Sequence, residues 1–109
     1  MDLESIKEAI QEFVDERDWE KYHTPKNIAM ALSVEASELA EVFQWLDNQK
    51  SFDKAIKDAA EEEIADVFYY VVRMCQVLDI DLEQAFHEKM KKNRIKHDVN
   101  KVKGKPIRK

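Results

Sequence analysis

The scarcity of helix-breaking residues is the feature that most restricts what this chain can fold into. Its 109 residues include one glycine and two prolines. A β-sandwich or β-barrel needs turns rich in glycine or proline every several residues, so this composition argues against an all-β protein. It also argues against collagen-like and low-complexity chains. Long helices with short connections are the architecture that remains, and the length predicts a single domain.

Apolar residues recur at helical spacing in four segments, which predicts four helices. Three of the expected ranges are residues 2–17, 25–47 and 82–97, and the remaining helix is expected to begin after Ser51 or Asp53 and to end at about Leu78 or Asp79. Because these helices are long and the connections between them are short, we expect an all-α protomer built as an antiparallel four-helix bundle.

Capping signals support these ranges. Thr24 followed by Pro25 is a strong start signal, because a hydroxyl can cap the helix and proline fits its first position. Ser51 or Asp53 can cap the third helix, and Asp81 can cap the fourth. The polar stretch at residues 18–24 reads as a loop.

The charge of the chain is distributed unevenly. The formal net charge is -5, but residues 98–109 carry a net +4 and residues 1–97 therefore carry -9. We expect a domain over residues 1–97 and a basic, mobile tail over residues 98–109. An acidic body is a poor match for the phosphate backbone of nucleic acid, so no nucleic-acid partner is expected. Such a body does suit a protein that collects divalent cations.

The single cysteine and the absence of long apolar runs bear on location. Cys75 cannot form an internal disulfide and reads as a reduced thiol in the core, which is typical of a cytoplasmic protein. No signal-like segment follows Met1 and no apolar stretch approaches ~20 residues, so no membrane partner is expected.

Four carboxylates lie at unusual positions on the second and third predicted helices. Glu35 and Glu63 each lie at the edge of their helix's apolar stripe, where a solvent-facing residue is not expected. Glu38 and Asp66 follow three residues later, each about 60° further from the stripe. The two helices thus carry the same arrangement of acidic groups.

Carboxylates placed this way would repel one another, and burial would raise their pKa values unless cations were present. Divalent cations remove both problems, because hard cations bind carboxylate oxygens and Mg²⁺ commonly shares the phosphates of a substrate. The alternative is that these are ordinary edge residues of amphipathic helices, paired with lysines. The spacing alone leaves both interpretations open.

The acidic pattern resembles a known signature. Glu35-x-x-Glu38, followed after 24 residues by Glu63-x-x-Asp66, is similar to the metal-binding motif of the all-α nucleoside triphosphate pyrophosphohydrolases, the MazG-like superfamily, and is closest to its dCTP pyrophosphatase branch. The resemblance spans about residues 10–97. Its other segments are Arg17-Asp18-Trp19-Glu20 with His23, Pro25-Lys26-Asn27, Phe43-Gln44-Trp45, Tyr69-Tyr70, Lys89-Met90 and Asn93-Arg94.

The resemblance implies hydrolysis of a nucleoside triphosphate to the monophosphate and pyrophosphate, dependent on Mg²⁺ with Mn²⁺ as a substitute. A pyrimidine deoxynucleotide is expected, dCTP first, in a role of nucleotide-pool sanitation. The implied metal ligands are Glu35, Glu38, Glu63 and Asp66. Either Glu38 or Glu63 would be the catalytic base. Lys89, Asn93 and Arg94 match phosphate-binding residues, and the positions around base and sugar are Trp19, His23, Asn27, Trp45 and Tyr70.

The resemblance also implies a homo-oligomer, either a dimer or a tetramer. Aromatic residues near the edges of the expected protomer give it more apolar surface than one core uses, which favours a tetramer over a dimer. Trp19 precedes the second predicted helix, whereas Trp45 lies near its far end, about 30 Å away. The two rings are therefore expected to meet in a pocket between subunits. One alternative function is a non-catalytic helical interaction module whose acidic edge binds a basic partner. A weaker one is a di-iron protein, since Glu20-x-x-His23 matches half of such a motif.

Overall fold

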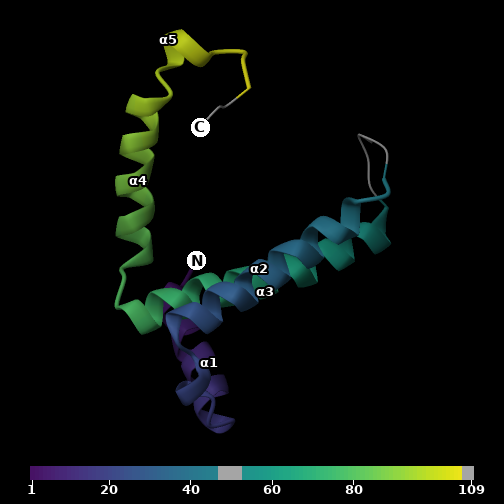
Figure 1. Cartoon of the computed structure of the whole chain (residues 1–109), viewed down its shortest axis with the longest axis vertical. Helices are drawn as coiled ribbons and strands as arrows, with labels where there is room; N and C mark the ends of the chain where they lie inside the picture. The colour runs from purple at the N-terminus through teal and green to yellow at the C-terminus, as the bar shows by residue number, and fades with distance from the viewer. Residues whose placement is uncertain (47–52, 107–109) are drawn as a thin grey trace. The chain divides into compact units, whose positions relative to one another are not determined.

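The computed structural model describes residues 1–46 and 53–106, and the regular elements in these ranges are all helical (Figure 1). They are α1 (Leu3–Glu16), the 3₁₀ helix η1 (Glu20–Tyr22), α2 (Pro25–Phe43), α3 (Lys54–Leu78), α4 (Leu82–Lys96) and α5 (Val99–Val102). The predicted all-α fold class is confirmed. None of the described helices combines the length and the hydrophobicity that a membrane span requires.

The chain divides after Asp79 into two compact units. The first contains α1, η1, α2 and α3, and the second begins at Ile80 and contains α4 and α5. The packing of a fourth helix against the other three therefore stays a prediction, as does the single domain over residues 1–97. Within the expected mobile tail, the structure has the short helix α5, which the sequence analysis did not predict.

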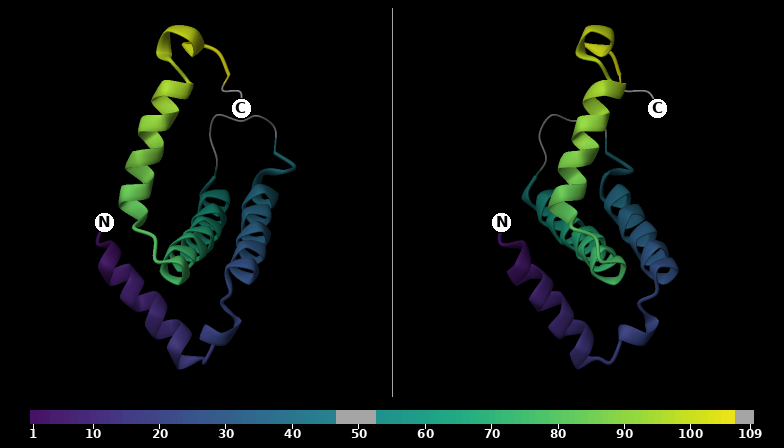
Figure 2. Two further views of the ribbon diagram at one scale, coloured as in Figure 1. Left: turned by 60° about the vertical axis from the view of Figure 1, so that its left-hand side comes forward. Right: turned by 90° about the vertical axis from the view of Figure 1, so that its left-hand side faces the viewer.

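In the first unit, α2 and α3 lie side by side and run antiparallel (Figures 1 and 2). α1 packs on the C-terminal part of α3, where the Gln76 side-chain amide donates to the backbone carbonyl of Lys7 at 2.9 Å. The apolar core of the described residues is small, and it lies where these three helices meet. Its buried members are Ile10, Val14, Ile28, Val72 and Cys75.

Each α-helix begins at a side chain that accepts a hydrogen bond from a backbone amide of the first turn, which satisfies a donor that the helix itself leaves unpaired. The cap residues are Asp2, Thr24, Asp53, Asp81 and Asp98. The predicted caps Thr24, Asp53 and Asp81 are confirmed, whereas Ser51 lies outside the described residues.

The end of α2 differs from the prediction. The sequence predicts a helix to residue 47, but α2 ends at Phe43. The amides of Gln44 and Leu46 bond to carbonyls three residues back, at 3.4 and 3.1 Å, so the chain continues as tight turns. Such turns roughly preserve helical spacing, which is why the apolar pattern runs on to Leu46. Trp45 therefore lies beyond the helix and not on its surface.

The predicted loop at residues 18–24 contains a turn of 3₁₀ helix. Asp18 adopts a left-handed backbone conformation with φ 55°, which reverses the chain after α1. The backbone amide of Trp19 then donates to the carbonyl of Val14 at 3.1 Å. These features fix the direction in which the chain enters η1.

We expect Thr24→Ala to lower the free energy of unfolding by about 1 kcal/mol, because Thr24 Oγ1 accepts from the amide of Asn27 at 3.2 Å and that amide would lose its partner. Urea denaturation followed by circular dichroism measures the change. Thr24→Ser keeps the oxygen and is the matched control. Equal stabilities for the alanine and serine variants would contradict a capping role.

Candidate functional site

Three of the four predicted metal ligands converge between α2 and α3. One carboxylate oxygen from each of Glu35, Glu63 and Asp66 lies within 4.8 Å of the other two. Glu35 comes from α2, and the other two come from α3. The pairing of the two helices therefore produces the convergence that the sequence spacing predicts. Glu38, the fourth predicted ligand, is exposed on α2 beside this group.

The carboxylates of Glu35 and Glu63 are poorly compensated. The Oε2 atoms of both are buried, and neither has a hydrogen-bond partner among the described residues. The pKa of Glu35 is raised to about 7, first by removal from water and then by the adjacent carboxylates of Glu38 and Asp66. Removal from water, followed by the Glu38 carboxylate, also raises the pKa of Glu63.

A buried oxygen without a partner is rare in a folded protein and asks for an explanation. A divalent cation provides one, because it would neutralise the repulsion and occupy the unpaired oxygens. Oxygen-only ligation by carboxylates suits a hard cation such as Mg²⁺, Mn²⁺ or Ca²⁺. The carboxylates of Glu35, Glu63 and Asp66 are thus suitable ligands for a divalent metal ion.

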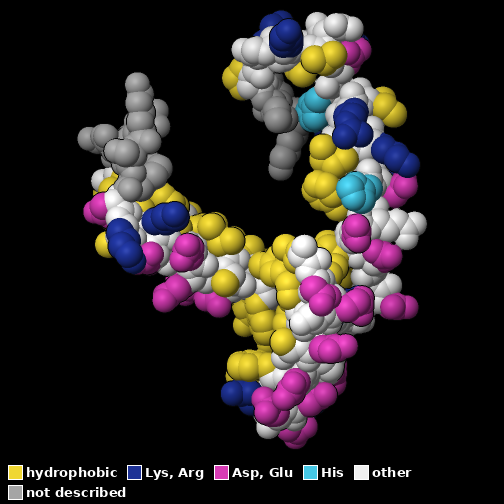
Figure 3. Space-filling view, turned by 180° about the vertical axis from the view of Figure 1, so that it is seen from behind, with side chains coloured by type: hydrophobic (Ala, Val, Ile, Leu, Met, Phe, Trp, Pro, Cys, Tyr) yellow, Lys and Arg dark blue, Asp and Glu magenta, His cyan; other side chains and the backbone are white. Residues whose placement is uncertain are grey.

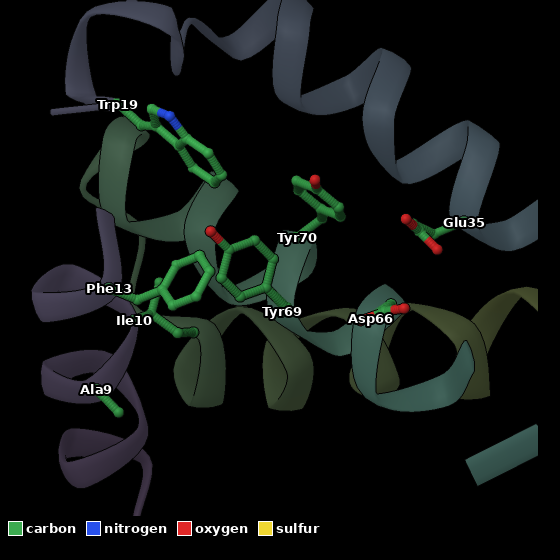
Figure 4. A pocket seen from close by; sticks show the side chains of 8 residues that line it. All are labelled: Ala9, Ile10, Phe13, Trp19, Glu35, Asp66, Tyr69 and Tyr70. Carbon is green, nitrogen blue, oxygen red and sulfur yellow. The ribbon is translucent and has the colours of Figure 1, made fainter. Parts of the chain in front are cut away.

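An aromatic pocket of about 420 Å³ adjoins the carboxylates, which is large enough for a small organic ligand (Figure 4). Glu35 and Asp66 form its acidic side. The rest of its lining comes from α1, the segment before η1, and α3, and comprises Ala9, Ile10, Phe13, Trp19, Tyr69 and Tyr70.

The rings of the pocket support one another in edge-to-face pairs. The centroid of Phe13 lies 5.8 Å from that of Trp19 and 6.1 Å from that of Tyr69, and Tyr69 lies 4.8 Å from Tyr70. The guanidinium of Arg17 lies 3.8 Å from the Phe13 centroid. Burial raises the pKa of both tyrosines, so both hydroxyls stay protonated and able to donate hydrogen bonds. Trp19 and Tyr70, both predicted base-binding positions, share this pocket.

His23 and Asn27 do not line the pocket. The Nδ1 atom of His23 accepts from the Nε of Arg73 at 2.8 Å. Burial, followed by the neighbouring Arg73 charge, lowers the pKa of His23, so its imidazole is neutral at pH 7. The side-chain amide of Asn27 donates to the backbone carbonyl of Tyr22 at 2.9 Å. Both residues thus hold the connection between α1 and α2, and their contact with a base or sugar stays a prediction.

Trp45 also lies apart from the pocket residues. It is 88% exposed, in the turn that follows α2. Within this protomer it does not join Trp19 in lining the pocket, in agreement with the distance argument from the sequence. Its role in base binding stays a prediction.

The predicted phosphate-binding residues belong to the second unit. Asn93 and Arg94 line an open hollow of about 430 Å³ on α4, together with Met90 and His97. Lys89 is exposed on the same helix. The three predicted residues thus share one helix, and their approach to a phosphate stays a prediction.

Arg73 is a buried residue of this region that the sequence analysis missed. It hydrogen-bonds to Glu20 and His23, the pair whose spacing matches half of a di-iron motif. The structure thus gives this pair a cationic side-chain partner. The sequence did indicate that Arg73 faces this region. At 100° per residue, Arg73 lies only about 20° from Asp66 around α3, on the side that carries the two tyrosines.

The fold and the acidic site define a class of protein. A helical hairpin that gathers carboxylates from both arms is the arrangement that the sequence motif predicts, and residues 30–105 match the MazG-like family. The chain belongs to this family.

Individual proteins similar to this chain include dCTP pyrophosphatases of mammals. The chain is 39% identical to dCTP pyrophosphatase 1 of Mus musculus over 106 residues, which cover 94% of this chain and 62% of that protein. It is 37% identical to dCTP pyrophosphatase 1 of Homo sapiens over 102 residues, covering 90% of this chain and 60% of that protein. The chain thus spans about three fifths of the length of these relatives.

A solved structure matches a larger share of its own chain. A pyrophosphatase from Archaeoglobus fulgidus is 40% identical and superposes with a TM-score of 0.78, covering 90% of this chain and 94% of that one. The similarity therefore holds in three dimensions as well as in sequence.

We expect Glu35→Gln to stabilise the metal-free protein at pH 8 and to have little effect at pH 4.5. The folded-state pKa of Glu35 is about 7 and its ordinary value is 4.5, so ionisation opposes folding above pH 4.5 and fully so above pH 7. Thermal unfolding of both proteins in a chelator, from pH 4.5 to 8, measures the difference. Comparing the two proteins removes the opposite pH dependence that His23 contributes.

A saturating divalent cation should reverse the order at pH 8, because the parent gains more from binding than the glutamine variant. Asp58→Asn, at an exposed carboxylate on α3 that pairs with Lys54, is the matched control and should show neither effect. A parent protein that is more stable than Glu35→Gln in chelator at pH 8 would contradict the repulsion described above.

Proposed function

We propose that the protein hydrolyses a nucleoside triphosphate to the monophosphate and pyrophosphate in a reaction that requires Mg²⁺, with Mn²⁺ as a substitute. The observation that carries the proposal is the pair of buried, unpartnered carboxylate oxygens beside an aromatic pocket. The family membership and the two named groups of relatives, dCTP pyrophosphatases and a pyrophosphatase, support it.

In this proposal Glu35, Glu63 and Asp66 hold the metal, with Glu38 as the fourth ligand. A bound cation would neutralise phosphate charge and lower the pKa of water. Water attacks the triphosphate, the bond between the α- and β-phosphoryl groups breaks, and pyrophosphate leaves. Glu38 or Glu63 takes the proton that the water loses. The raised pKa of Glu63 makes its carboxylate a better proton acceptor than an ordinary glutamate.

The aromatic pocket supports recognition of the base. Aromatic faces bind bases by stacking, and Trp19 and Tyr70 place such rings next to the carboxylates. We infer a pyrimidine deoxynucleotide as the substrate, dCTP first, because the relatives that match the chain are named for that nucleotide. The function would be nucleotide-pool sanitation in the cytoplasm, where the lone thiol of Cys75 stays reduced.

The proposal also includes the predicted phosphate-binding residues. Lys89, Asn93 and Arg94 would bind the triphosphate, whose negative charge an acidic protein can accept only through metal ions and local cations. The alternative, an interaction module whose acidic edge binds a basic partner, fits the geometry less well. Such a module needs its carboxylate oxygens at the surface, whereas Oε2 of Glu35 and of Glu63 are buried.

Pyrophosphate release from a panel of nucleoside triphosphates, with Mg²⁺ and with chelator, tests the activity. We expect release with Mg²⁺, fastest for dCTP. Glu63→Gln should lower kcat at least ~100-fold with its helical content unchanged, because it removes charge but keeps size. The matched control is Glu62→Gln, at the exposed neighbouring position on α3, which should keep the parent's kcat.

Two outcomes would argue against the proposal. No hydrolysis of any nucleotide in the panel would remove the activity, and the interaction module would become the better explanation. Parent-like activity of Glu63→Gln at saturating Mg²⁺ would remove Glu63 from the metal ligands. Loss of activity in both glutamine variants would show only that this turn of α3 tolerates no change.

We further propose that the active form is a homo-oligomer, a tetramer rather than a dimer, with pockets completed between subunits. Hydrophobic side chains gather along the α2–α3 pair on the face in Figure 3. Met30, Val34 and Ile64 are among the exposed apolar side chains of this pair. A surface of this kind marks an interaction site, and Trp45 is exposed enough to enter a neighbouring subunit's pocket.

Trp19→Ala and Trp45→Ala should each raise KM roughly 5- to 150-fold, since stacking on a base contributes ~1–3 kcal/mol. When the two variants are mixed and their subunits exchange, part of the parent's affinity should return, because some interfaces then carry neither substitution. Light scattering establishes the assembly, and mass spectrometry of labelled subunits establishes exchange. Confirmed exchange without recovery, or a 12.9 kDa particle, would contradict shared pockets.

A further inference from the structure

Arg73 is the one buried charged side chain of the described residues, with 1% of its surface exposed. A guanidinium withdrawn from water this completely is tolerated only when hydrogen bonds replace its hydration. Four such bonds are present. Nε donates to His23 Nδ1 at 2.8 Å, Nη2 to Glu20 Oε2 at 2.8 Å, and Nη1 to the side-chain oxygens of Gln11 at 3.0 Å and Gln76 at 2.9 Å.

These partners connect three segments of the first unit. Gln76 is on α3 with Arg73, Gln11 is on α1, and the other two partners flank η1. Gln11 closes the network, because its amide nitrogen donates to Glu20 Oε1 at 3.0 Å. Arg73 and Gln11 therefore share the two oxygens of one carboxylate, and both interactions lower the pKa of Glu20. The network ties η1 to α1 and to α3.

Trp19 stands directly before Glu20 and is the N-terminal cap residue of η1. Its ring lines the aromatic pocket (Figure 4). Its backbone amide fixes where the chain leaves α1, but the position of the following turn depends on the bonds from Arg73. Arg73 also lies one turn beyond Tyr69 and two turns beyond Asp66 on α3. The helix that carries the metal ligands thereby also holds the segment that carries the tryptophan.

We propose that Arg73 is a positioning residue for nucleobase recognition. Through Glu20 and His23 it fixes Trp19 over the pocket, and it thereby sets the affinity for the base while the enclosed guanidinium itself touches no part of the nucleotide. This inference rests on the proposed nucleotide pyrophosphohydrolase activity.

Two variants test it from opposite ends of the network. Arg73→Met keeps an unbranched stem and removes all four hydrogen bonds. Glu20→Ala acts on a side chain that is 60% exposed, so it is expected to fold even if the first variant does not. We expect KM for dCTP to rise about tenfold in each, with kcat within about threefold of the parent. Lys21→Ala is the matched control in the same turn, since Lys21 pairs with Asp18 and is not bonded to Arg73.

A ligand without a base separates the positioning of Trp19 from a general loosening of the site. Inorganic tripolyphosphate, measured as a competitive inhibitor, should bind Arg73→Met and Glu20→Ala as it binds the parent. In the Trp19→Ala background, adding Arg73→Met should leave KM unchanged, because the ring through which Arg73 acts is gone. An additive rise of KM in the double variant, or an equal loss of tripolyphosphate affinity, would overturn the proposal.

Fluorescence tests the positioning without any activity. With Trp45→Phe as background, Trp19 is the only tryptophan, and Arg73→Met or Glu20→Ala should increase the quenching of its fluorescence by acrylamide. If the protein hydrolyses no nucleotide but quenching rises, the proposed function fails while the positioning by Arg73 stands. Unchanged quenching in both variants would overturn the positioning role, whatever the activity.

Discussion

Repulsion among carboxylates enclosed between α2 and α3 is the constraint on which the rest of the structure depends. Where the two helices pack, Oε2 of Glu35 and Oε2 of Glu63 are buried, and nothing in the described chain provides those oxygens with a donor. Either a proton or a cation must relieve the charge, so folding and ligand binding are coupled at this interface. A small apolar core stabilises the helical pair against this repulsion. It lies where α1 meets α2 and α3.

The sequence predicts the local features of this fold well, because they depend on interactions over three or four residues. Helix starts follow from side chains that cap their own first turn, as at Thr24 and Asp53. The convergence of Glu35 with Glu63 and Asp66 also follows, since matching angular positions on two neighbouring helices must meet when the helices pair. The scarcity of glycine and proline also argues against all-β folds, which need turns rich in these residues, and favours long helices.

Other features depend on contacts between distant segments, and the sequence alone misses them. The spacing of Glu20 and His23 matches half of a di-iron motif, but in the structure both side chains accept hydrogen bonds from Arg73, about fifty residues later in the chain. Trp45 follows a helical pattern although α2 has ended, because tight turns have nearly the same spacing as a helix.

The order of side chains along α3 has a consequence for how such a protein can diversify. Glu63 and Arg73 stand ten residues apart on one rigid helix, a distance of about 15 Å. The acidic group thus lies nearer one end of this helix, and the support for the aromatic ring lies nearer the other. Substitutions around Arg73 can retune which ligand fits without disturbing the carboxylates. Under the proposed function, selectivity and reaction chemistry can therefore evolve, or be engineered, as nearly independent traits.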